Sequence, residues 1–367
     1  MKTKETKTEH VCEFCGHILT EEETHRFNNV EMCESCFNSR TTNCDCCGTR
    51  IWRDDAEGNE NTVLCERCYN EYYTHCERCG RLISYDDACY FDGSDEPYCN
   101  GCYDVLNNAP IHDYGYKPEP IFYGDGSLYM GVELEIDEGG ECDRNAEMLL
   151  DTANVNETHI YCKHDGSIDS GFEIVSHPMT LDYHTNCMPW QELFRKALSM
   201  GYYSHQTDTC GLHVHVNRNL FGKTYQDQED AISRVVYFVE NHWNELLKFS
   251  RRTEANMNRW ASRYGISTTA KDTYKKAKDK HCGRYVAVNL ENYSTIEFRL
   301  FRGTLRYKTF IATLQLVEEI CRHALQMDDC GIEGMSWSEF VTHIPESKAE
   351  LIEYLKMKRL YVNEEVR

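Results

Sequence analysis

A cysteine motif that occurs three times near the start of the chain constrains its fold most strongly. Each copy begins with Cys-x-x-Cys-Gly, and the first cysteines, Cys12, Cys44 and Cys76, follow at a period of 32 residues. A second Cys-x-x-Cys, followed by an aromatic residue, comes after 17, 17 and 19 intervening residues. The full sets are Cys12, Cys15, Cys33 and Cys36; Cys44, Cys47, Cys65 and Cys68; and Cys76, Cys79, Cys99 and Cys102. This repetition indicates three small units of one kind.

The spacing of the motif predicts zinc. Two thiolates two residues apart can bind one tetrahedral Zn²⁺ from a tight turn, and the second pair completes a Cys₄ set. Each unit is too small to fold on an apolar core, so the metal supplies the folding free energy. We therefore predict about three structural zinc ions, in modules resembling zinc ribbons or treble clefs over residues 1–38, 39–71 and 72–107; cross-brace pairing between adjacent modules is the alternative that the similar loop lengths disfavour. Cys46 and Cys89 have no counterpart in the repeat.

The compartment expected from the sequence agrees with metal-bound rather than oxidised cysteines. Of the 21 cysteines in 367 residues, 14 lie before residue 105. The first ten residues include lysines but no apolar stretch typical of a signal peptide, and no apolar run reaches the roughly 18 residues that span a membrane. We expect a cytoplasmic protein with no membrane partner, in which disulfides are disfavoured.

The charge of the chain excludes some functions. The net charge is −22, and residues 1–108 contribute −12 from 10 basic and 22 acidic side chains. General nucleic-acid binding by the zinc modules is therefore disfavoured, because their negative field repels phosphates. Docking of a protein or peptide partner suits them better. With four cysteines per zinc, no coordination position is left open for catalysis.

The remainder of the chain predicts a second, larger domain. Residues 108–124 contain three of the seven prolines and indicate an extended linker. From 125 to 367, strand and helix patterns are interspersed, which predicts an α+β domain with an antiparallel sheet covered by helices on one face. The expected strands are 128–137, 172–178, 212–217, 285–291 and 295–302. The expected helices are 226–249, 308–327 and one that begins with a capping box from Ser347 to Glu350.

The strands share a polar face of unusual composition. Alternation places Glu133 and Glu135 opposite the apolar side chains of the first strand, and it does the same for His213 and His215 of the third. If the strands form one sheet, the side chains that line a common cup are Glu133, Glu135, Glu173, His213, His215, Glu297 and Arg299. Carboxylates so close together repel one another, and cations relieve this. Oxygen-rich sites suit Mg²⁺, and the imidazoles make Mn²⁺ more plausible.

Two further features concern the same face. Arg302 has the wrong parity for it unless the strand ends or bulges there. Residues 251–284 carry ten basic and three acidic side chains, a local charge of +7. That segment is either a solvated basic loop or a flap over a polyanion such as a nucleoside triphosphate.

Taken in order, the motifs resemble the amidoligase family of carboxylate–amine ligases, whose fold is similar to that of glutamine synthetase. The resemblance spans roughly residues 110–330. It rests on Gly131-Val-Glu133-Leu-Glu135, Asp165-Gly-Ser167, Gly171-Phe-Glu173-Ile-Val-Ser176-His-Pro178, Cys210-Gly211-Leu-His213-Val-His215, Asn289-Leu, and Thr295-Ile-Glu297-Phe-Arg299-Leu-Phe-Arg302-Gly303-Thr304. Zinc modules before such a domain are consistent with phage or bacterial members.

The resemblance implies a reaction and a set of roles. ATP phosphorylates a carboxylate, and an amine then attacks the acyl phosphate to form an amide or isopeptide bond. Glu133, Glu135 and Glu173 then hold Mg²⁺ or Mn²⁺, while His213 or His215 and Glu297 complete a second metal site. Arg299 and Arg302 meet phosphate oxygens, with Asn289 beside the nucleotide, and Asp165 positions the amine or another substrate group. The substrates implied are a carboxylate and an amine, including a peptide or protein.

Two alternatives stay open at this point. The His213-x-His215 pair also suits a metal-dependent hydrolase, although such a pair usually precedes the other metal residues instead of lying midway. A non-catalytic adaptor built around the zinc modules is the second alternative. ATP consumption separates the three, because only the ligase needs ATP together with an acid and an amine.

Overall fold

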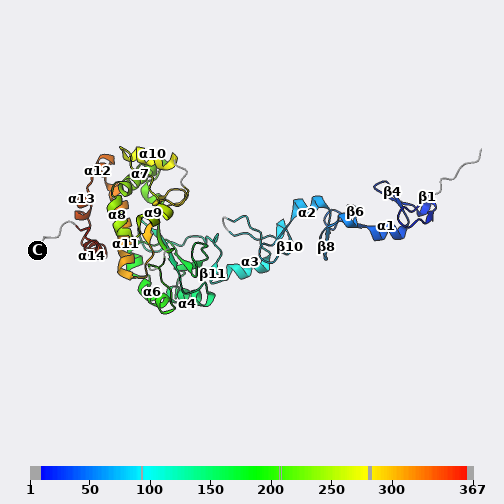
Figure 1. The fold of residues 1–367 in the computed structure, drawn as a ribbon, viewed down its shortest axis with the longest axis horizontal. Helices are drawn as coiled ribbons and strands as arrows, with labels where there is room; N and C mark the ends of the chain where they lie inside the picture. Colours follow the sequence, from blue (N-terminus) through cyan, green and yellow to red (C-terminus); the bar gives the residue numbers. More distant parts are fainter. Residues whose placement is uncertain (1–9, 92–93, 206, 208, 280–282, 362–367) are drawn as a thin grey trace, which may run out of the picture. The chain divides into compact units, whose positions relative to one another are not determined.

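The structure is a computed structural model that describes residues 10–91, 94–205, 207, 209–279 and 283–361. The chain separates into two compact units, residues 1–107 and 108–367. Figure 1 shows short hairpins and helices in the first unit, and a sheet with many helices in the second. Within the described residues, none of the helices combines the length and apolar character needed to cross a membrane.

The first unit repeats one arrangement of a knuckle, a hairpin and a short helix. In the first module, β1 (His10–Val11) pairs with β2 (Ile18–Leu19), β3 (His25–Phe27) pairs with β4 (Val30–Met32), and α1 (Glu34–Arg40) follows. The second has β5 (Thr41–Asn43) with β6 (Arg50–Trp52), β7 (Glu57–Asn59) with β8 (Thr62–Leu64), and α2 (Glu66–Tyr72). The third has β9 (Tyr73–His75) with β10 (Leu82–Ser84), a bridge between Cys89 and Tyr98, and α3 (Asn100–Asn107). Short 3₁₀ turns occupy Glu21–Glu23, Arg53–Asp55 and Tyr85–Asp87.

A seven-stranded sheet forms the centre of the second unit. Its strands are β11 (Ile111–His112), β12 (Met130–Ile136), β13 (Ile160–Lys163), β14 (Phe172–Ser176), β15 (Gly211–Asn217), β16 (Val288–Asn289) and β17 (Thr295–Arg302). They lie in the order β11-β13-β14-β12-β15-β17-β16, and every pair is antiparallel except β11 with β13. This confirms a mixed α and β domain with a largely antiparallel sheet.

Helices bury the apolar face of this sheet. Their bounds are α4 (Asp143–Ala153), α5 (Leu181–Asn186), α6 (Trp190–Ser199), α7 (Tyr225–Asn241), α8 (Trp243–Ser250), α9 (Glu254–Trp260), α10 (Ala270–Asp279), α11 (Tyr307–Gln326), α12 (Asp329–Gly334), α13 (Trp337–Thr342) and α14 (Ala349–Met357), with a 3₁₀ turn at Arg218–Phe221. Leu134, Val214 and Phe298, from three neighbouring strands, are fully buried and join side chains of these helices in one core. α11 packs against both α7 and α14.

Several expected elements differ in the structure. The strand expected at 285–291 is reduced to β16, and the helix expected at 226–249 is divided into α7 and α8 at His242. β11 lies within the segment expected as a linker, and β13 was not predicted. The capping box at Ser347 is wrong. α14 has Lys348 at its N-cap, and the Glu350 carboxylate accepts a hydrogen bond from Gln315 of α11 instead.

Candidate functional site

The register of the sheet brings the acidic and imidazole side chains together. Glu133 of β12 lies opposite His213 of β15, and His215 lies opposite Glu297 of β17. On the other side of β12, Glu135 lies opposite Glu173 of β14. Side chains directly opposite one another in an antiparallel pair are about 5 Å apart at Cβ, so they interact directly. The cup predicted from strand alternation is therefore formed.

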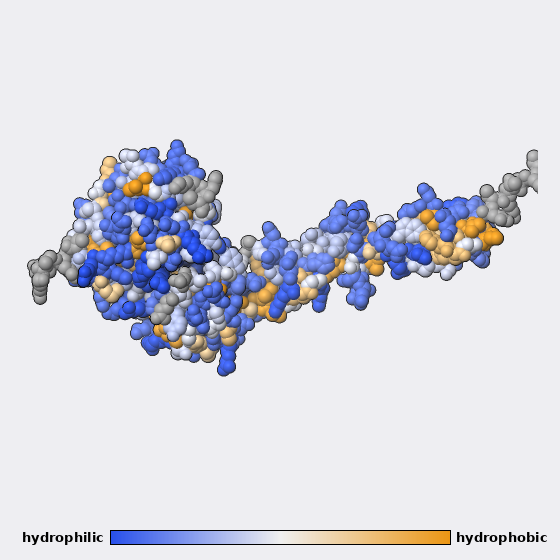
Figure 2. All heavy atoms as spheres, viewed as in Figure 1, coloured by the Kyte–Doolittle hydropathy of each residue, from blue (hydrophilic) through white to orange (hydrophobic). Residues whose placement is uncertain are grey.

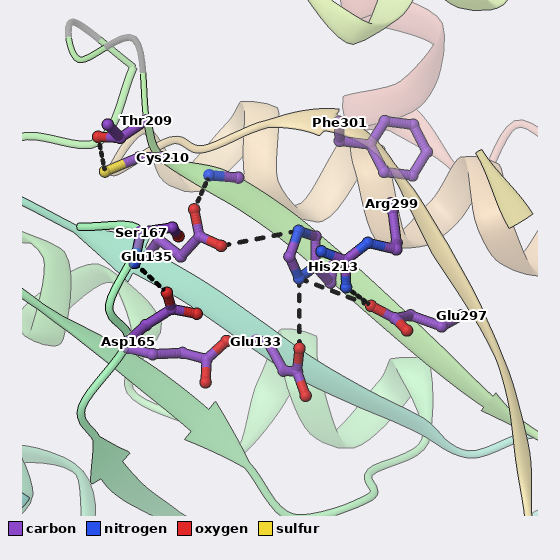
Figure 3. A network of polar contacts seen from close by, with 12 residues as sticks. Glu133, Glu135, Asp165, Ser167, Thr209, Cys210, His213, Glu297, Arg299 and Phe301 are labelled. Atoms are coloured by element: carbon purple, nitrogen blue, oxygen red, sulfur yellow. Dashed lines mark hydrogen bonds and ion pairs between the residues drawn. The ribbon is translucent and has the colours of Figure 1, made fainter. Parts of the chain in front are cut away.

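Glu133 is the shared partner of both histidines. His213 Nδ1 lies 3.2 Å from Glu133 Oε2, and His215 Nε2 lies 3.1 Å from Glu133 Oε1. The same two nitrogens lie 3.6 and 3.9 Å from Oε1 of Glu297. Figure 3 shows the Glu133, Glu135 and Glu297 carboxylates converging around the His213 ring.

Glu297 is fixed by amide and guanidinium groups. Asn289 of β16 donates to Glu297 Oε2 at 2.9 Å, and Asn292 donates to the same oxygen at 3.2 Å. Arg299, two residues along β17, forms an ion pair with Oε1. Only 3% of Glu297 is exposed, so these partners are what keeps a charged group stable there. Asn289 and Arg299, both predicted to belong to the site, therefore contact it through Glu297.

The opposite end of the cup is formed by Glu135, Glu173 and Asp165. Glu135 accepts a hydrogen bond from the backbone N–H of Gly211, and its Oε1 lies 3.8 Å from His213 Nε2. Glu173 faces the buried Lys163 of β13, with 3.8 Å between Nζ and Oε2. Asp165 is half-buried in the turn after β13, where its Oδ1 accepts a hydrogen bond from Ser167 N–H at 2.7 Å.

The carboxyl groups of the cup have pKa values shifted in opposite directions. Burial raises the pKa of Glu173 well above its usual range, and the charge of Glu133 adds to this effect. Burial also raises the pKa of Glu135, against the opposing effect of His213. Burial acts in the same direction on Glu133, but His215 and His213 outweigh it and hold that pKa well below its usual range. The site thus contains too many buried carboxyls for its own cations to neutralise all of them.

The donor set fits divalent cations. Glu133, His215 and Glu297 each offer a ligand atom within 4.8 Å of the others, and so do Glu133, Glu173 and His213. Carboxylate oxygens with one imidazole per set match the ligands of Mn²⁺, and Mg²⁺ also accepts the oxygens. The two sets share Glu133 and use different histidines. Both histidines, which the sequence did not distinguish, are therefore placed to serve a metal.

Aromatic and basic side chains gather beside the cup. Tyr114 lies under two cations, with Lys163 Nζ 5.3 Å and the Arg284 guanidinium carbon 5.4 Å from its ring centre. The Arg299 guanidinium lies 5.8 Å from the Tyr285 ring centre. The basic segment 251–284 contains α9 and α10, so it is not a structureless loop, and both ends of it reach the site: Arg252 near Glu135 and Arg284 beside Tyr114.

Arg302 reaches the polar face through an irregularity in β17. Leu212 pairs with Phe301 whereas Val214 pairs with Phe298, so β17 has an extra residue at this point. The sequence placed Arg302 on the polar face only if the strand bulged, and the structure has this β-bulge. Arg302 lies opposite Gly211 of β15. Its guanidinium donates to Thr207 C=O at 3.2 Å, whereas that of Arg299 forms an ion pair with Glu297.

Two site residues were not predicted. Lys163 was missed because its strand is only four residues long. The available signal was the alternation of the strand, which places Cys162 on the core face of the sheet and Lys163 on its polar face. Arg252 follows α8, donates to Phe301 C=O at 3.2 Å and leaves a buried Nε without a hydrogen bond. Burial lowers the pKa of Arg252 to about 10 against the opposing effect of Glu135. Only the tertiary structure brings Arg252 to the cup.

The three Cys₄ sets have the geometry of zinc centres. The four sulfurs of each set lie within 4.8 Å of one another. The Cys15–Cys33 sulfurs are 3.7 Å apart, and those of Cys47–Cys65 and Cys79–Cys99 are 3.8 Å apart. A ZnS₄ tetrahedron with bonds of about 2.3 Å has edges of about 3.8 Å. The sets are therefore compatible with one Zn²⁺ each.

Backbone N–H groups favour the thiolate form of the first cysteine in each module, Cys12, Cys44 and Cys76, whereas burial and the neighbouring thiols raise the pKa of Cys36, Cys68 and Cys102. The glycines after the first pairs, Gly16, Gly48 and Gly80, have φ of +74°, +72° and +68°, as the knuckle turn requires. Burial opposes ionisation of Cys12 and Cys76, but backbone N–H groups outweigh it and lower the pKa of each thiol to about 6. The second pair of each module lies at the start of a helix, as Cys33 does at the N-cap of α1.

One comparison with known proteins identifies a family over part of the second unit. Residues 141–321 match a family described as "Putative amidoligase enzyme". The match confirms the resemblance to the amidoligase family, and it covers Asp165, Glu173, both histidines, Glu297 and both arginines of the predicted set. Glu133 and Glu135 precede the matched residues.

The other comparisons are more distant. The chain is similar to a bifunctional glutathione synthetase from Pasteurella multocida at 13% identity and a TM-score of 0.29. The likeness covers 64% of this chain and 44% of that protein, so this chain spans less than half of its length. A TM-score of this size is below that of proteins sharing a fold. None of the curated protein sequences matches the chain.

Proposed function

We propose that residues 125–367 form an ATP-dependent ligase that joins a carboxylate to an amine through an acyl phosphate. The observation that carries the proposal is the pair of ligand sets that share Glu133 on one face of the sheet, with Lys163, Arg252 and Arg299 around them. A glutamine-synthetase-like arrangement of this domain belongs to the same proposal. The family match over residues 141–321 supports the class of reaction.

The metal ions of this proposal are Mg²⁺ or Mn²⁺. Glu133, His215 and Glu297 would hold one ion, and Glu133, Glu173 and His213 would hold another, with Glu135 beside them. When bound, these ions would neutralise phosphate charge and keep the transferred group in line with the carboxylate. The buried carboxyls thus acquire the positive charge that the chain's own cations supply only in part.

The remaining steps follow from charge and position. A carboxylate oxygen of the acid attacks the γ-phosphorus of ATP, the bond to the β-phosphate oxygen breaks, and ADP leaves. The amine nitrogen then attacks the acyl carbon, inorganic phosphate departs and the nitrogen loses a proton. We assign phosphate oxygens to Arg299, Arg252 and Arg302, the nucleotide side to Asn289, and the orientation of the amine to Asp165. Most of the rate then comes from positioning and charge neutralisation.

The zinc modules are proposed to dock a protein or peptide, either the substrate or a partner. Figure 2 shows apolar groups gathered on the first module, where Val11, Phe14 and Ile18 are 42%, 44% and 63% exposed. An apolar patch on an acidic module suits a partner with apolar and basic side chains. We also propose that the protein works in the reducing cytoplasm, where the thiolates remain available for zinc.

A substrate screen tests the proposed activity. Purified protein is incubated with ATP, Mg²⁺ or Mn²⁺ and panels of acids and amines, and ADP is measured. We expect ADP only when an acid and an amine are both present, and we expect none with Glu297→Gln. Glu147→Gln, an exposed change on α4, is the control and retains full turnover. Turnover without ATP would indicate the hydrolase, and a protein inactive with every pair would indicate the adaptor.

A further inference from the structure

A second cavity lies at the end of β17, outside the carboxylate cup. Its volume is about 140 Å³, roughly ten times what a single water needs. It lies where β17 leads into α11, beside the residues that follow α8 and α14. Its basic lining residues are His205, Arg251, Arg302, Arg306 and Lys358.

The positive charge of this cavity has no carboxylate to balance it among the described residues that line it. Among the described residues, the guanidinium groups of Arg251 and Arg302 donate only to backbone carbonyls, those of Arg302 and Thr207. Tyr354, also in the lining, donates its hydroxyl proton to Phe249 C=O at 3.2 Å, and burial raises its pKa to about 12, so it stays neutral. Clustered cations of this kind destabilise a fold unless they bind something negative.

One lining group has a buried atom with no partner. His205 Nδ1 forms no hydrogen bond within the described chain. Burial lowers the pKa of His205, and the neighbouring charges of Arg251, Arg302 and Arg306 lower it further. Neutral imidazole with a free donor tautomer complements an anionic oxygen, as do the guanidinium forks.

The cavity adjoins the cup through two consecutive arginines. Arg251 donates to the carbonyl of Arg302, at the cavity, and Arg252 donates to the carbonyl of Phe301 and faces Glu135. Arg251 has φ of +66° just after α8, and this turn sends the two side chains to different places. The two consecutive arginines thus place one guanidinium at the cavity and the other within electrostatic range of Glu135.

We propose that this cavity is an oxyanion-binding subsite that holds a phosphate or carboxylate group of a ligand of the ligase site. The source is either a phosphate of the nucleotide or a carboxylate of the acid substrate other than the one that reacts. The identity of the ligand, nucleotide or acid substrate, rests on the proposed function. The binding of an oxyanion in the cavity does not depend on it. The subsite would favour acids with a second anionic group, or nucleotides with an intact polyphosphate.

Binding of inorganic phosphate to the full-length, zinc-loaded protein, without added Mg²⁺ or Mn²⁺, tests the subsite. Titration calorimetry at low chloride compares the wild type with Arg306→Gln/Lys358→Gln. The matched control is Lys308→Gln/Lys356→Gln, which removes the same charge from exposed positions on α11 and α14. We expect phosphate to bind the wild type and the control alike, and the cavity variant about tenfold or more weakly, as the loss of charged hydrogen bonds predicts. Equal affinity for all three proteins, or no binding to the wild type at millimolar phosphate, would overturn the proposal.

The same variants identify the source of the oxyanion. If ATP weakens about tenfold on the cavity variant while a tricarboxylate such as citrate is unaffected, the subsite holds nucleotide phosphate. The reverse result assigns it to the acid substrate. Both titrations are done on the zinc-loaded protein without added Mg²⁺ or Mn²⁺ and without turnover. If the wild type binds phosphate but turns over no ATP with any pair of substrates, the ligase proposal is contradicted and the oxyanion subsite is not.

Discussion

Glu133 Oε2 lies 3.2 Å from His213 Nδ1, across the pair formed by β12 and β15. The other oxygen of the same carboxylate lies 3.1 Å from His215. One side chain therefore connects both ligand sets of the cup. This arrangement follows from strand register alone, because a slip of one residue would send Glu133 into the apolar core.

Substitution of Glu133 by Gln should remove metal binding without removing the fold. Gln keeps the size of the side chain and loses the charge that both ligand sets share. We expect the affinity for Mn²⁺ to fall on the order of 100-fold, as measured by calorimetry or by the electron paramagnetic resonance of free Mn²⁺. Glu147→Gln, on the surface of α4, is the control. Unchanged Mn²⁺ affinity in Glu133→Gln would exclude the cup as the metal site.

The zinc content should be three ions per chain, one for each Cys₄ set. In the third module, Cys76→Ser removes a ligand and should leave two ions, as counted by elemental analysis after dialysis. Cys89→Ser in the same module changes a cysteine whose thiol contacts Asn100 instead of a Cys₄ set, and it should keep three. If the two variants held equal amounts of zinc, the assignment of ligands in this module would be wrong.

Gly171 allows β14 to start close beside β12. A Cβ at this position would lie 1.9 Å from the carbonyl oxygen of Ile136, which is backbone and cannot move aside cheaply. We expect Gly171→Ala to lower the free energy of unfolding by about 2 kcal/mol or more. Gly166→Ala, in the loop just before, meets its nearest atom at 4.0 Å and should be neutral. Urea unfolding of the two variants checks this, and equal stabilities would argue against the tight β12–β14 approach.

His184 should make the second unit less stable in acid. It is fully buried, with Nε2 bonded to Met130 C=O and Nδ1 accepting from Trp190, so a second proton has no place. Burial lowers its pKa from 6.5 to about 4. As the pH falls, the unfolded chain therefore binds the proton before the folded one does. The contribution of neutral His184 to the free energy of unfolding is complete above pH 6.5 and is lost as the pH falls toward 4. The difference amounts to about 3 kcal/mol.

A variant isolates that contribution from other titrating groups. Gln at position 184 can still donate to Met130 C=O but does not titrate. Unfolding by urea at a series of pH values should show a steeper loss of stability below pH 6.5 for the wild type than for His184→Gln. Parallel curves for the two proteins would show that His184 is not the group responsible.

Residues with strong local patterns were predicted well. The alternation in 295–302 matches β17 to the residue, and the repeated cysteine spacing matches the three sulfur sets. The parity argument also located the acidic and imidazole side chains, because alternation fixes the face once the strand is known.

Long-range contacts account for what the sequence did not predict. β13 is short and lies between loops, and its Lys163 can be recognised as a site residue only once it is seen to pair with Glu173. Arg252 belongs to a segment whose charge was evident but whose target, beside Glu135, depends on how α8 packs on β17. The Ser347 capping box failed because Gln315 of α11 competes for Glu350.

The most direct test of the ligase mechanism follows oxygen atoms. Once the screen has supplied a substrate pair, the acid is labelled with ¹⁸O in both carboxylate oxygens, and the released phosphate is examined by mass spectrometry. Attack of the carboxylate on ATP followed by displacement of phosphate transfers one labelled oxygen, so we predict one ¹⁸O in each phosphate formed with the amide. Amide formation with unlabelled phosphate, or with the label in AMP, would contradict the acyl-phosphate route.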